Sequence, residues 1–493
     1  MVKRLSVQEL NKISVKKEVW CFGCGKRLND MLNLYRKESF VQRITKLIDN
    51  NEKIHGHIKK IGESQVCITG ADVIRKKGSC NVILLITSDS YNVIYEGLKE
   101  EIKEYMISCY VYPIYYYSVT EKLIRFFSRF PIRRQMIFMA GSEPHENADA
   151  IVRYHTEEYK GRKYKIIYLT DGKAVKNQPV IYLDKNLVRL RANIIKVIRY
   201  CWLYAGTAYL LYENEPIHKV RCEQKLFYMN HGTIPLKRVN DVLSQPEEVD
   251  FALCPSKRCA RLYEEQYHVA RNKQLYIMPP RIQTFLYHQK SIEQIIPLRG
   301  RQIIIWLPTF RQLRGTERRD SAVMETLSIL KNQEVFAKLD CKLKQNRQLL
   351  VIKPHPREET EERIPDFCSH IKIITDEKLN SNNLVLHEIM GNTAALITDY
   401  SGIAFEYLLL NKPICYLIGD MDEYTRGFSV KFPKEYMPGP KVKNLMEFFD
   451  FLDDVKSNKD TYQTERKQVM KKIYDENIWE NGAEKLIEFL DRE

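Results

Sequence analysis

The chain has 493 residues, of which 44% are hydrophobic and 29% charged, and it carries a formal net charge of +15. This length exceeds what one hydrophobic core supports, so we expect two or three folded domains. No run of about 18 apolar residues and no signal-peptide pattern occurs, which argues against a membrane-spanning or secreted protein. The twelve cysteines follow no framework spacing, so they indicate reduced thiols in a cytoplasmic protein.

Residues 1–118 form the first predicted domain. Strands are predicted at 18–22, 44–48, 66–68 and 82–87, and a helix at 91–105. This alternation is typical of a small doubly wound α/β domain with a Rossmann-like sheet.

A glycine turn follows the first of these strands. Gly23 and Gly25 stand between strand and helix, and Asp49 ends the next strand. This pattern is a candidate nucleotide site, because glycines let backbone N–H groups approach a diphosphate and an acid can bind a ribose. The third glycine of the dinucleotide pattern is missing, since Leu28 stands at its position. A docking or regulatory domain is therefore the alternative.

Two segments concentrate positive charge. Residues 119–134 form a basic connector that contains Phe126, Phe127 and Phe130, and residues 185–204 carry further basic residues beside isoleucines and Trp202. Either segment could be a basic amphipathic helix on an anionic membrane surface, or a core-facing helix with a solvated charged side. No nucleic-acid-binding module is recognisable, so nucleic acid is not an expected partner.

Residues 135–298 again alternate predicted strands and helices, which indicates a second parallel sheet. The strand predicted at 226–229 leads into His231, Gly232 and Thr233, with Lys237 shortly after. His231 therefore follows the carboxyl end of a strand, where α/β proteins bind ligands. A lone histidine is often structural, but this position makes His231 a candidate catalytic residue.

Residues 299–493 form the third predicted domain. Its first strand, 302–307, leads to Arg311, whose guanidinium can bind a diphosphate through two N–H groups. The next strand delivers Lys353 and His355 between prolines that stop the strand.

A later strand, 394–398, ends in the turn Asp399-Tyr400-Ser401-Gly402, and helical spacing resumes at 403–410. A helix start of this kind favours a phosphate, because its N–H groups are free and its dipole attracts negative charge. Asp420 and Asp422 could form a metal pair, although we favour a solvated acidic turn. The tail, 445–490, is predicted as helices with charged outer faces.

Five motifs occur in a characteristic order. They are HGT followed by PLK (231–237), PTFR (308–311), KPHP (353–356), TDYS-x-x-x-F-E (398–406) and Y-x-RG (424–427). In this set the chain resembles the CDP-glycerol glycerophosphotransferases, the polymerase family of teichoic acids and capsules, over about residues 135–475. The resemblance implies two Rossmann-like lobes of GT-B type, preceded here by the extra small domain. Residues 135–298 would be the acceptor lobe and residues 299–493 the CDP-donor lobe with C-terminal helices.

The resemblance also implies an activity. The expected reaction moves a polyol phosphate, glycerol phosphate or ribitol phosphate, from a CDP-activated donor to a hydroxyl of a cell-envelope polymer or its lipid-linked primer, and releases CMP. The expected partners are the CDP-polyol, a polyanionic or lipid-linked glycan acceptor and an anionic membrane surface. The expected place is the cytoplasm, with peripheral binding to the inner face of the cell membrane. Neither a cofactor nor a metal is expected.

Roles follow for individual residues where the motifs match. His231 would be the general base toward the acceptor hydroxyl, and His355 would hydrogen-bond the diphosphate or the leaving group. Negative charge in the transition state would be neutralised by Arg311 and by the turn Ser401-Gly402. Glu406 would accept hydrogen bonds from the ribose. Lys353 and Asp399 would support the donor site, and Thr233 and Lys237 would lie on the acceptor side.

Three departures from the family pattern touch these surfaces. Ile234 is inserted after HGT, Gly402 replaces a second serine, and residues 280–283 read PRIQ where many members have PRND. The choice between glycerol and ribitol, and between one addition and polymerisation, therefore stays open. Two other functions also stay open, namely a GT-B glycosyltransferase that uses a nucleotide sugar and a non-catalytic scaffold of envelope-polymer synthesis.

Overall fold

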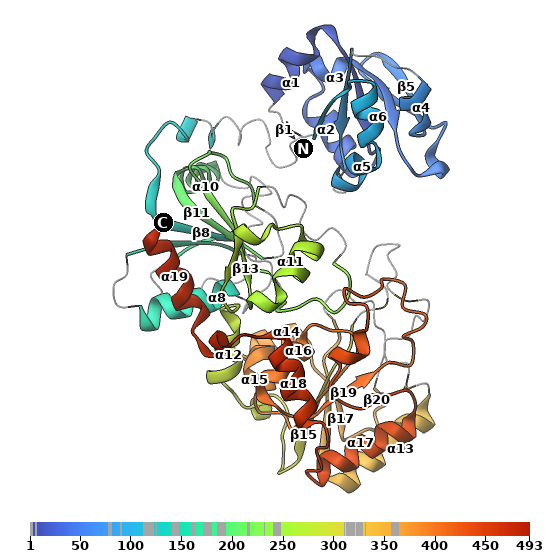
Figure 1. Cartoon of the computed structure of the whole chain (residues 1–493), viewed down its shortest axis with the longest axis vertical. Coiled ribbons are helices and arrows are strands. Elements are labelled where there is room, and N and C mark those ends of the chain that lie inside the picture. The colour runs from blue at the N-terminus through green and yellow to red at the C-terminus, as the bar shows by residue number, and fades with distance from the viewer. Residues whose placement is uncertain are drawn as a thin grey trace. The chain divides into compact units, whose positions relative to one another are not determined.

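The fold is known from a computed structural model of the chain (Figure 1). Contacts divide the chain into one unit of Met1–Pro131 with Asn193–Gly206 and another of Ile132–Ala192 with Thr207–Glu493. The described residues are 3–4, 7–76, 81–88, 91–111, 123–124, 126–140, 147–159, 163–170, 180–184, 194–213, 217–230, 232–239, 248–309, 311, 321, 329–330, 332–355 and 364–493.

The first unit contains a sheet that is parallel except at one edge. Its strand order is β1-β7-β6-β2-β3-β5-β4, and only the β4–β5 pair is antiparallel among the pairings of the described residues. The strands are β1 (Lys3–Arg4), β2 (Glu18–Phe22), β3 (Ile44–Ile48), β4 (Ile58–Ile61), β5 (Ser64–Thr69), β6 (Val82–Ile86) and β7 (Ser108–Val111). The helices include α1 (Val7–Ile13), α2 (Lys26–Leu34), α3 (Ser39–Gln42), α4 (Asp72–Lys76), α5 (Tyr91–Gly97), α6 (Lys99–Glu104) and α10 (Ile194–Gly206).

Strand β2 shows why this sheet is covered on both faces. Val19 and Cys21 belong to one hydrophobic cluster, whereas Trp20 and Phe22 belong to another. Successive side chains of a strand point to opposite faces, so both faces carry a buried layer. The predicted doubly wound arrangement is confirmed, and the β4–β5 hairpin is an addition that the sequence did not suggest.

The second unit contains two parallel sheets, one in each of two lobes that we name, after their predicted ligands, the acceptor lobe and the donor lobe. The first sheet belongs to the acceptor lobe. Its order is β10-β9-β8-β11-β12-β13-β14. The strands are β8 (Arg133–Ala140), β9 (Lys165–Thr170), β10 (Val180–Asp184), β11 (Thr207–Tyr212), β12 (Lys225–Tyr228), β13 (Phe251–Cys254) and β14 (Gln274–Tyr276). Helices α8 (Asn147–Arg153), α11 (Ala260–Tyr267) and α12 (Arg281–Tyr287) belong to the same lobe.

The other parallel sheet belongs to the donor lobe and has the order β17-β16-β15-β18-β19-β20. The strands are β15 (Gln302–Leu307), β16 (Gln348–Ile352), β17 (Ile371–Ile373), β18 (Ala395–Thr398), β19 (Ile414–Leu417) and β20 (Lys441–Val442). The helices include α13 (Gln333–Asn346), α14 (Asp376–Ser381), α15 (Leu386–Met390), α16 (Ile403–Tyr407), α17 (Leu445–Lys456), α18 (Gln463–Ile473) and α19 (Gly482–Arg492).

Helix α19 crosses back to the acceptor lobe at the end of the chain, as Figure 1 shows in dark red. Leu486 and Leu490 join the hydrophobic cluster of the acceptor-lobe sheet. At the start of this helix a Cβ on Gly482 would lie 2.0 Å from the carbonyl oxygen of Met278, so only glycine fits there. Within the described residues, no helix combines the length and the hydropathy that crossing a bilayer requires.

Candidate active site

The end of strand β12 is held by a network of buried amides. His231 itself lies outside the described residues, but Asn230 before it has a left-handed backbone with φ of 57°. Asn230 Nδ2 donates to Tyr263 Oη at 2.7 Å, and its Oδ1 accepts from the backbone N–H of Gly232 at 3.3 Å. Asn147 Nδ2 donates to the carbonyl of Asn230 at 2.9 Å. The backbone on both sides of His231 is therefore fixed by groups from α8 and α11.

Residues 232–238, which we call the acceptor loop, lie against the donor lobe. A Cβ on Gly402 would lie 2.9 Å from the carbonyl oxygen of Ile234, so the glycine permits a close approach of the two backbones. Lys237 forms an antiparallel bridge with Phe428. The loop that follows one predicted histidine thus meets the turn that was predicted to bind the donor.

Residues 399–402, which we call the donor turn, connect β18 to α16. The α-helix is shorter than predicted. It ends at Tyr407, and the next residues, Leu408–Leu410, form a 3₁₀ turn. Its N-cap is Gly402, which offers no capping side chain, whereas Ser401 Oγ accepts from the N–H of Ile403 at 3.5 Å. The helix dipole therefore contributes less to anion binding than the sequence suggested.

The segments that carry His355, Arg311 and the donor turn all follow the carboxyl ends of neighbouring parallel strands, which are β16, β15 and β18. His355 follows β16 and is partly exposed. Lys353 is buried, and its Nζ lies 2.8 Å from a carboxylate oxygen of Asp376. Lys353 is therefore placed to support the backbone that leads to His355.

Arg311 follows strand β15, as predicted, but its side chain has acidic partners that were not predicted. Its side chain is buried, with Nη1 2.9 Å from Asp399 and Nε 2.7 Å from Asp420. These ion pairs occupy the guanidinium that we had expected to bind a diphosphate. Asp420 is likewise buried rather than solvated, so the prediction of an exposed acidic turn is wrong for this residue. Asp399 also accepts from the backbone N–H of Thr309 at 3.0 Å, so the cluster ties β15 to β18.

Glu406 lies in the first turn of α16, as predicted, and its carboxylate pairs with residues of both lobes. One carboxylate oxygen pairs with Arg281 of the acceptor lobe, and the other lies 2.9 Å from His387 Nε2. Burial alone would raise the pKa of Glu406, but Arg281 and His387 lower it to about 2. Both oxygens of this buried carboxylate are paired, so Glu406 joins the two lobes, and its contact with a ribose stays a prediction. The sequence had drawn attention to Arg281 through the PRIQ segment, residues 280–283, whereas nothing in the sequence pointed to His387.

The glycine turn of the first unit carries its own acid. Asp49 Oδ2 accepts from the N–H of Cys24 at 2.7 Å, and Oδ1 accepts from the N–H of Asn51 at 2.9 Å. Gly23, Gly25 and Asp49 are thus brought together, but the carboxylate that we had assigned to a ribose binds the backbone of the turn itself. In the predicted nucleotide site, the carboxylate of Asp49 is therefore already hydrogen-bonded to the protein backbone.

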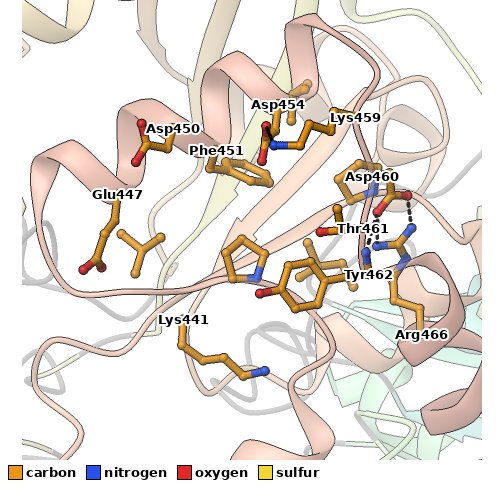
Figure 2. Close-up of a pocket in the computed structure, with 15 residues that line it drawn as sticks. Lys441, Glu447, Asp450, Phe451, Asp454, Lys459, Asp460, Thr461, Tyr462 and Arg466 are labelled. Carbon is orange, nitrogen blue, oxygen red and sulfur yellow. Dashed lines mark hydrogen bonds and ion pairs between the residues drawn. The ribbon is translucent and has the colours of Figure 1, made fainter.

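A cavity of about 370 Å³ lies elsewhere in the donor lobe, between α17 and the starts of β19 and β20 (Figure 2). Its charged residues pair with one another, as Asp460 does with Arg466 and Asp454 with Lys459. The predicted site residues follow the other ends of the strands, so this cavity is not the candidate site. Among the described residues, no cluster of three histidine, cysteine or acidic side chains could hold a metal ion.

Similar proteins complete the description. The chain is 24% identical over 279 residues to the teichoic acid glycerol-phosphate transferase of Staphylococcus aureus, which covers 53% of this chain and 66% of that protein. It is 22% identical over 250 residues to the teichoic acid ribitol-phosphate primase of Bacillus spizizenii, covering 49% and 59%. The chain thus spans less than two thirds of these relatives.

A solved structure of a variant of the wall teichoic acid polymerase TagF superposes with a TM-score of 0.57 at 16% identity, over 82% of this chain and 97% of that one. This likeness confirms the predicted paired-lobe fold. A family model described as CDP-Glycerol:Poly(glycerophosphate) glycerophosphotransferase matches residues 123–484. Because that match covers well over half of the sequence, the chain belongs to this glycerophosphotransferase family.

Proposed function

We propose that this chain transfers a polyol phosphate from a CDP-activated donor to a hydroxyl of a teichoic-acid-like polymer. The family membership and the names of its relatives, which are glycerol-phosphate and ribitol-phosphate transferases and primases, support this reaction class. A related TagF structure was soaked with CDPG, which supports a CDP-polyol as the donor.

The observation that carries the proposal is the meeting of the two lobes at Gly402 and Ile234. A group transfer needs donor and acceptor within bonding distance, so the acceptor-side and donor-side segments must adjoin. Here the segment that follows His231 contacts the turn of the opposite lobe, and His355 follows a strand two positions from β18 in the same sheet.

In the proposed reaction, the acceptor oxygen forms a bond to the phosphorus of the polyol phosphate. The phosphoanhydride bond breaks, and CMP leaves with the bridging oxygen. His231 takes the proton of the acceptor hydroxyl, because imidazole is the side chain whose ordinary pKa lies near neutrality. His355 hydrogen-bonds the diphosphate, and Ser401 with Gly402 contacts the phosphate oxygens. Lys237 lines the acceptor side, whereas Thr233 is fully buried and supports the acceptor loop from within.

The test is CMP release from CDP-glycerol and CDP-ribitol, compared with UDP or GDP release from nucleotide sugars. We expect CMP release that falls about 10²- to 10⁴-fold in His231→Ala and in His355→Ala. His57→Ala, an exposed histidine of the first unit, is the matched control and should keep full activity. Release of UDP or GDP instead would support a glycosyltransferase. An unchanged rate of CMP release in both histidine variants would refute the proposed roles.

We further propose that the acceptor is lipid-linked and that the first unit binds an anionic membrane surface. Phe127 and Phe130 each pack on Trp202 with ring centroids 5.3 Å apart, so the Phe-rich connector and α10 form one surface. That surface exposes apolar side chains, with Ile195 72% exposed and Phe126 50% exposed. The basic residues beside them, also exposed, are Arg129, Lys196 and Arg199.

Apolar groups beside basic ones match the interface of an anionic bilayer, where each basic residue adds about 1 kcal/mol. In sedimentation with vesicles of anionic lipid we expect the protein to bind, and we expect added salt to weaken this binding. The double variant Ile194→Glu/Ile195→Glu should also bind more weakly than the wild-type protein. Met446→Glu, which changes an equally exposed side chain of the donor lobe, is the control. Absence of binding at low salt would remove the membrane proposal and leave the transfer reaction untouched.

A further inference from the structure

The acceptor loop is paired with a short segment of the donor lobe, residues 424–429. The N–H of Arg238 donates to the carbonyl of Gly427 at 3.1 Å, and the N–H of Ser429 donates to the carbonyl of Leu236 at 2.9 Å. Between these bonds lies the bridge of Lys237 and Phe428. The two segments thus form a small antiparallel ribbon that crosses from one lobe to the other.

Side chains reinforce this ribbon. Ser429 Oγ lies within hydrogen-bonding distance of two carbonyl oxygens of the acceptor loop, that of Leu236 at 3.1 Å and that of Pro235. Arg426 Nε donates to the carbonyl of Arg238 at 2.7 Å. These bonds hold the backbone of the loop rather than its side chains, so they fix where the loop lies.

The same segment packs directly on the donor turn. Tyr424 and Phe428 place their rings 4.5 Å and 5.3 Å from the ring of Tyr400, measured between centroids, and 5.5 Å from each other. Tyr400 is the second residue of the donor turn and is fully buried. Aromatic rings at such distances attract one another, so the three rings pack as one block.

The buried cluster of Arg311, Asp399 and Asp420 contacts this block of rings. Tyr400 Oη donates to Asp420 at 2.9 Å, and the guanidinium of Arg311 lies 5.6 Å from the ring of Tyr400 and 6.0 Å from that of Tyr424. Arg311 therefore acts on the donor turn through Tyr400 and the two acids. This gives a physical reason for a buried arginine at a position where we had expected a ligand contact.

We propose that residues 424–429 are an interlobe clasp that sets the acceptor loop against the donor turn. The proposal rests on the proposed transfer reaction, because in-line attack tolerates only small errors in the distance between the two substrates. Ser429 and Phe428 are then positioning residues, since they contact the loop and the turn. They align the lobes on which the acceptor and the donor bind.

Two variants remove separate parts of the clasp. Ser429→Ala deletes the hydroxyl that bonds the two carbonyls, and Ser429→Thr restores one. Phe428→Ala deletes the ring that packs on Tyr400. Phe432→Ala is the matched control, because this side chain is 57% exposed. Each full-length variant is measured by hydrogen–deuterium exchange of the acceptor loop and by steady-state kinetics with a CDP-polyol, with and without acceptor.

We expect faster exchange in the acceptor loop of Phe428→Ala and Ser429→Ala, with unchanged exchange in strands β15 and β16. We expect kcat for transfer to fall about ten- to a hundredfold while KM for the CDP-polyol stays within about twofold. Release of CMP to water without acceptor should not change. Ser429→Thr should recover both the protection and the rate, which a general loss of stability would not allow.

Unchanged protection of the loop in both variants would overturn the clasp, whatever the activity. Lost protection with a normal transfer rate would overturn its positioning role. If the wild-type protein releases no CMP from any CDP-polyol while the variants still lose protection, the clasp stands as a structural connection and the proposed reaction falls.

Discussion

Two turns of this molecule each contain a glycine after a buried strand, and they differ in the hydrogen bonds that their aspartates accept. Each follows a buried strand, β2 in the first unit and β18 in the donor lobe, and each has an aspartate nearby. Asp49 accepts from the backbone of its own turn, through Cys24 N–H. Asp399 accepts from the N–H of Tyr400 in its own turn at 2.6 Å, and also from the end of another strand, through Thr309 and Arg311. Both acids thus bind a backbone N–H of their turn, and Asp399 in addition fastens its turn to the neighbouring strand.

The difference shows what a turn needs before it can receive a partner. In both turns a carboxylate lies on one backbone N–H, that of Cys24 or that of Tyr400, so this bond does not separate the two turns. In the donor lobe Asp399 is drawn toward Arg311, and the glycine of the turn meets the acceptor loop. Because the donor turn meets the acceptor loop of the opposite lobe, we infer that this turn takes part in the transfer reaction.

Removing Arg311 should have the largest effect and would test the fastening of the donor turn. Arg311→Met leaves Asp399 and Asp420 buried without their cation, which should lower the free energy of unfolding by about 3–5 kcal/mol. Urea unfolding followed by fluorescence measures this. Arg261→Met, which changes an exposed arginine paired with Glu265, should cost less than about 1 kcal/mol.

A compensating variant checks the cause. Arg311→Met combined with Asp420→Asn removes one of the two stranded charges, so part of the lost stability should return. If Arg311→Met alone is as stable as the wild-type protein, the arginine does not fasten the turn and remains available to a diphosphate, as the sequence first suggested.

Acid should weaken the link between the two lobes, because Glu406 follows the donor turn and pairs with Arg281 of the acceptor lobe. Its pKa of about 2 in the folded chain lies below the ordinary 4.5. A lowered folded pKa stabilises the fold above the unfolded value, and this stabilisation is lost as the pH falls from about 4.5 toward 2. The shift corresponds to about 3 kcal/mol.

Unfolding free energies measured from pH 7 to pH 2 test this expectation. The wild-type protein should lose stability over the acid range, whereas Glu406→Gln should start lower and show a flatter acid limb. The exposed Glu423→Gln serves as the control and should keep the wild-type slope. An acid limb that is equally steep in Glu406→Gln would show that other carboxylates carry the pH dependence.

The strands were predictable where their sequence is strongly marked. β-Branched and aromatic runs bounded by glycine, proline or asparagine gave β2, β3 and β15 with the bounds that the structure has. The short strands β13 and β14 were not predicted, because three or four residues of mixed character carry too little periodicity. Strand β4 and its antiparallel pairing were missed for the same reason, since Lys59 and Lys60 interrupt the alternation, whereas residues 66–68 of β5 were predicted.

The site was predictable in its residue types but not in its pairings. Arg311 follows a strand and Glu406 starts a helix, as predicted, yet their partners stand on segments that only the tertiary fold brings near. Asp420 is 109 residues from Arg311, and Arg281 is 125 residues from Glu406. His387 and Asn147 carry no local signal at all. The role of His231 stays a prediction, because that residue lies outside the described part of the chain.

The smallest expected effect comes from Asp49 and bears directly on the comparison of the two turns. Asp49→Asn weakens the carboxylate's bond to Cys24 N–H near the start of α2, which should cost about 0.5–1 kcal/mol of stability. Calorimetric titration of the full chain with CDP should give one bound nucleotide per chain, before and after the change. Asp422→Asn, at an exposed acid of the donor lobe, is the control. Two bound nucleotides in the wild-type protein and one in Asp49→Asn would mean that the first turn does receive a ligand, with Asp49 leaving the backbone to bind a ribose.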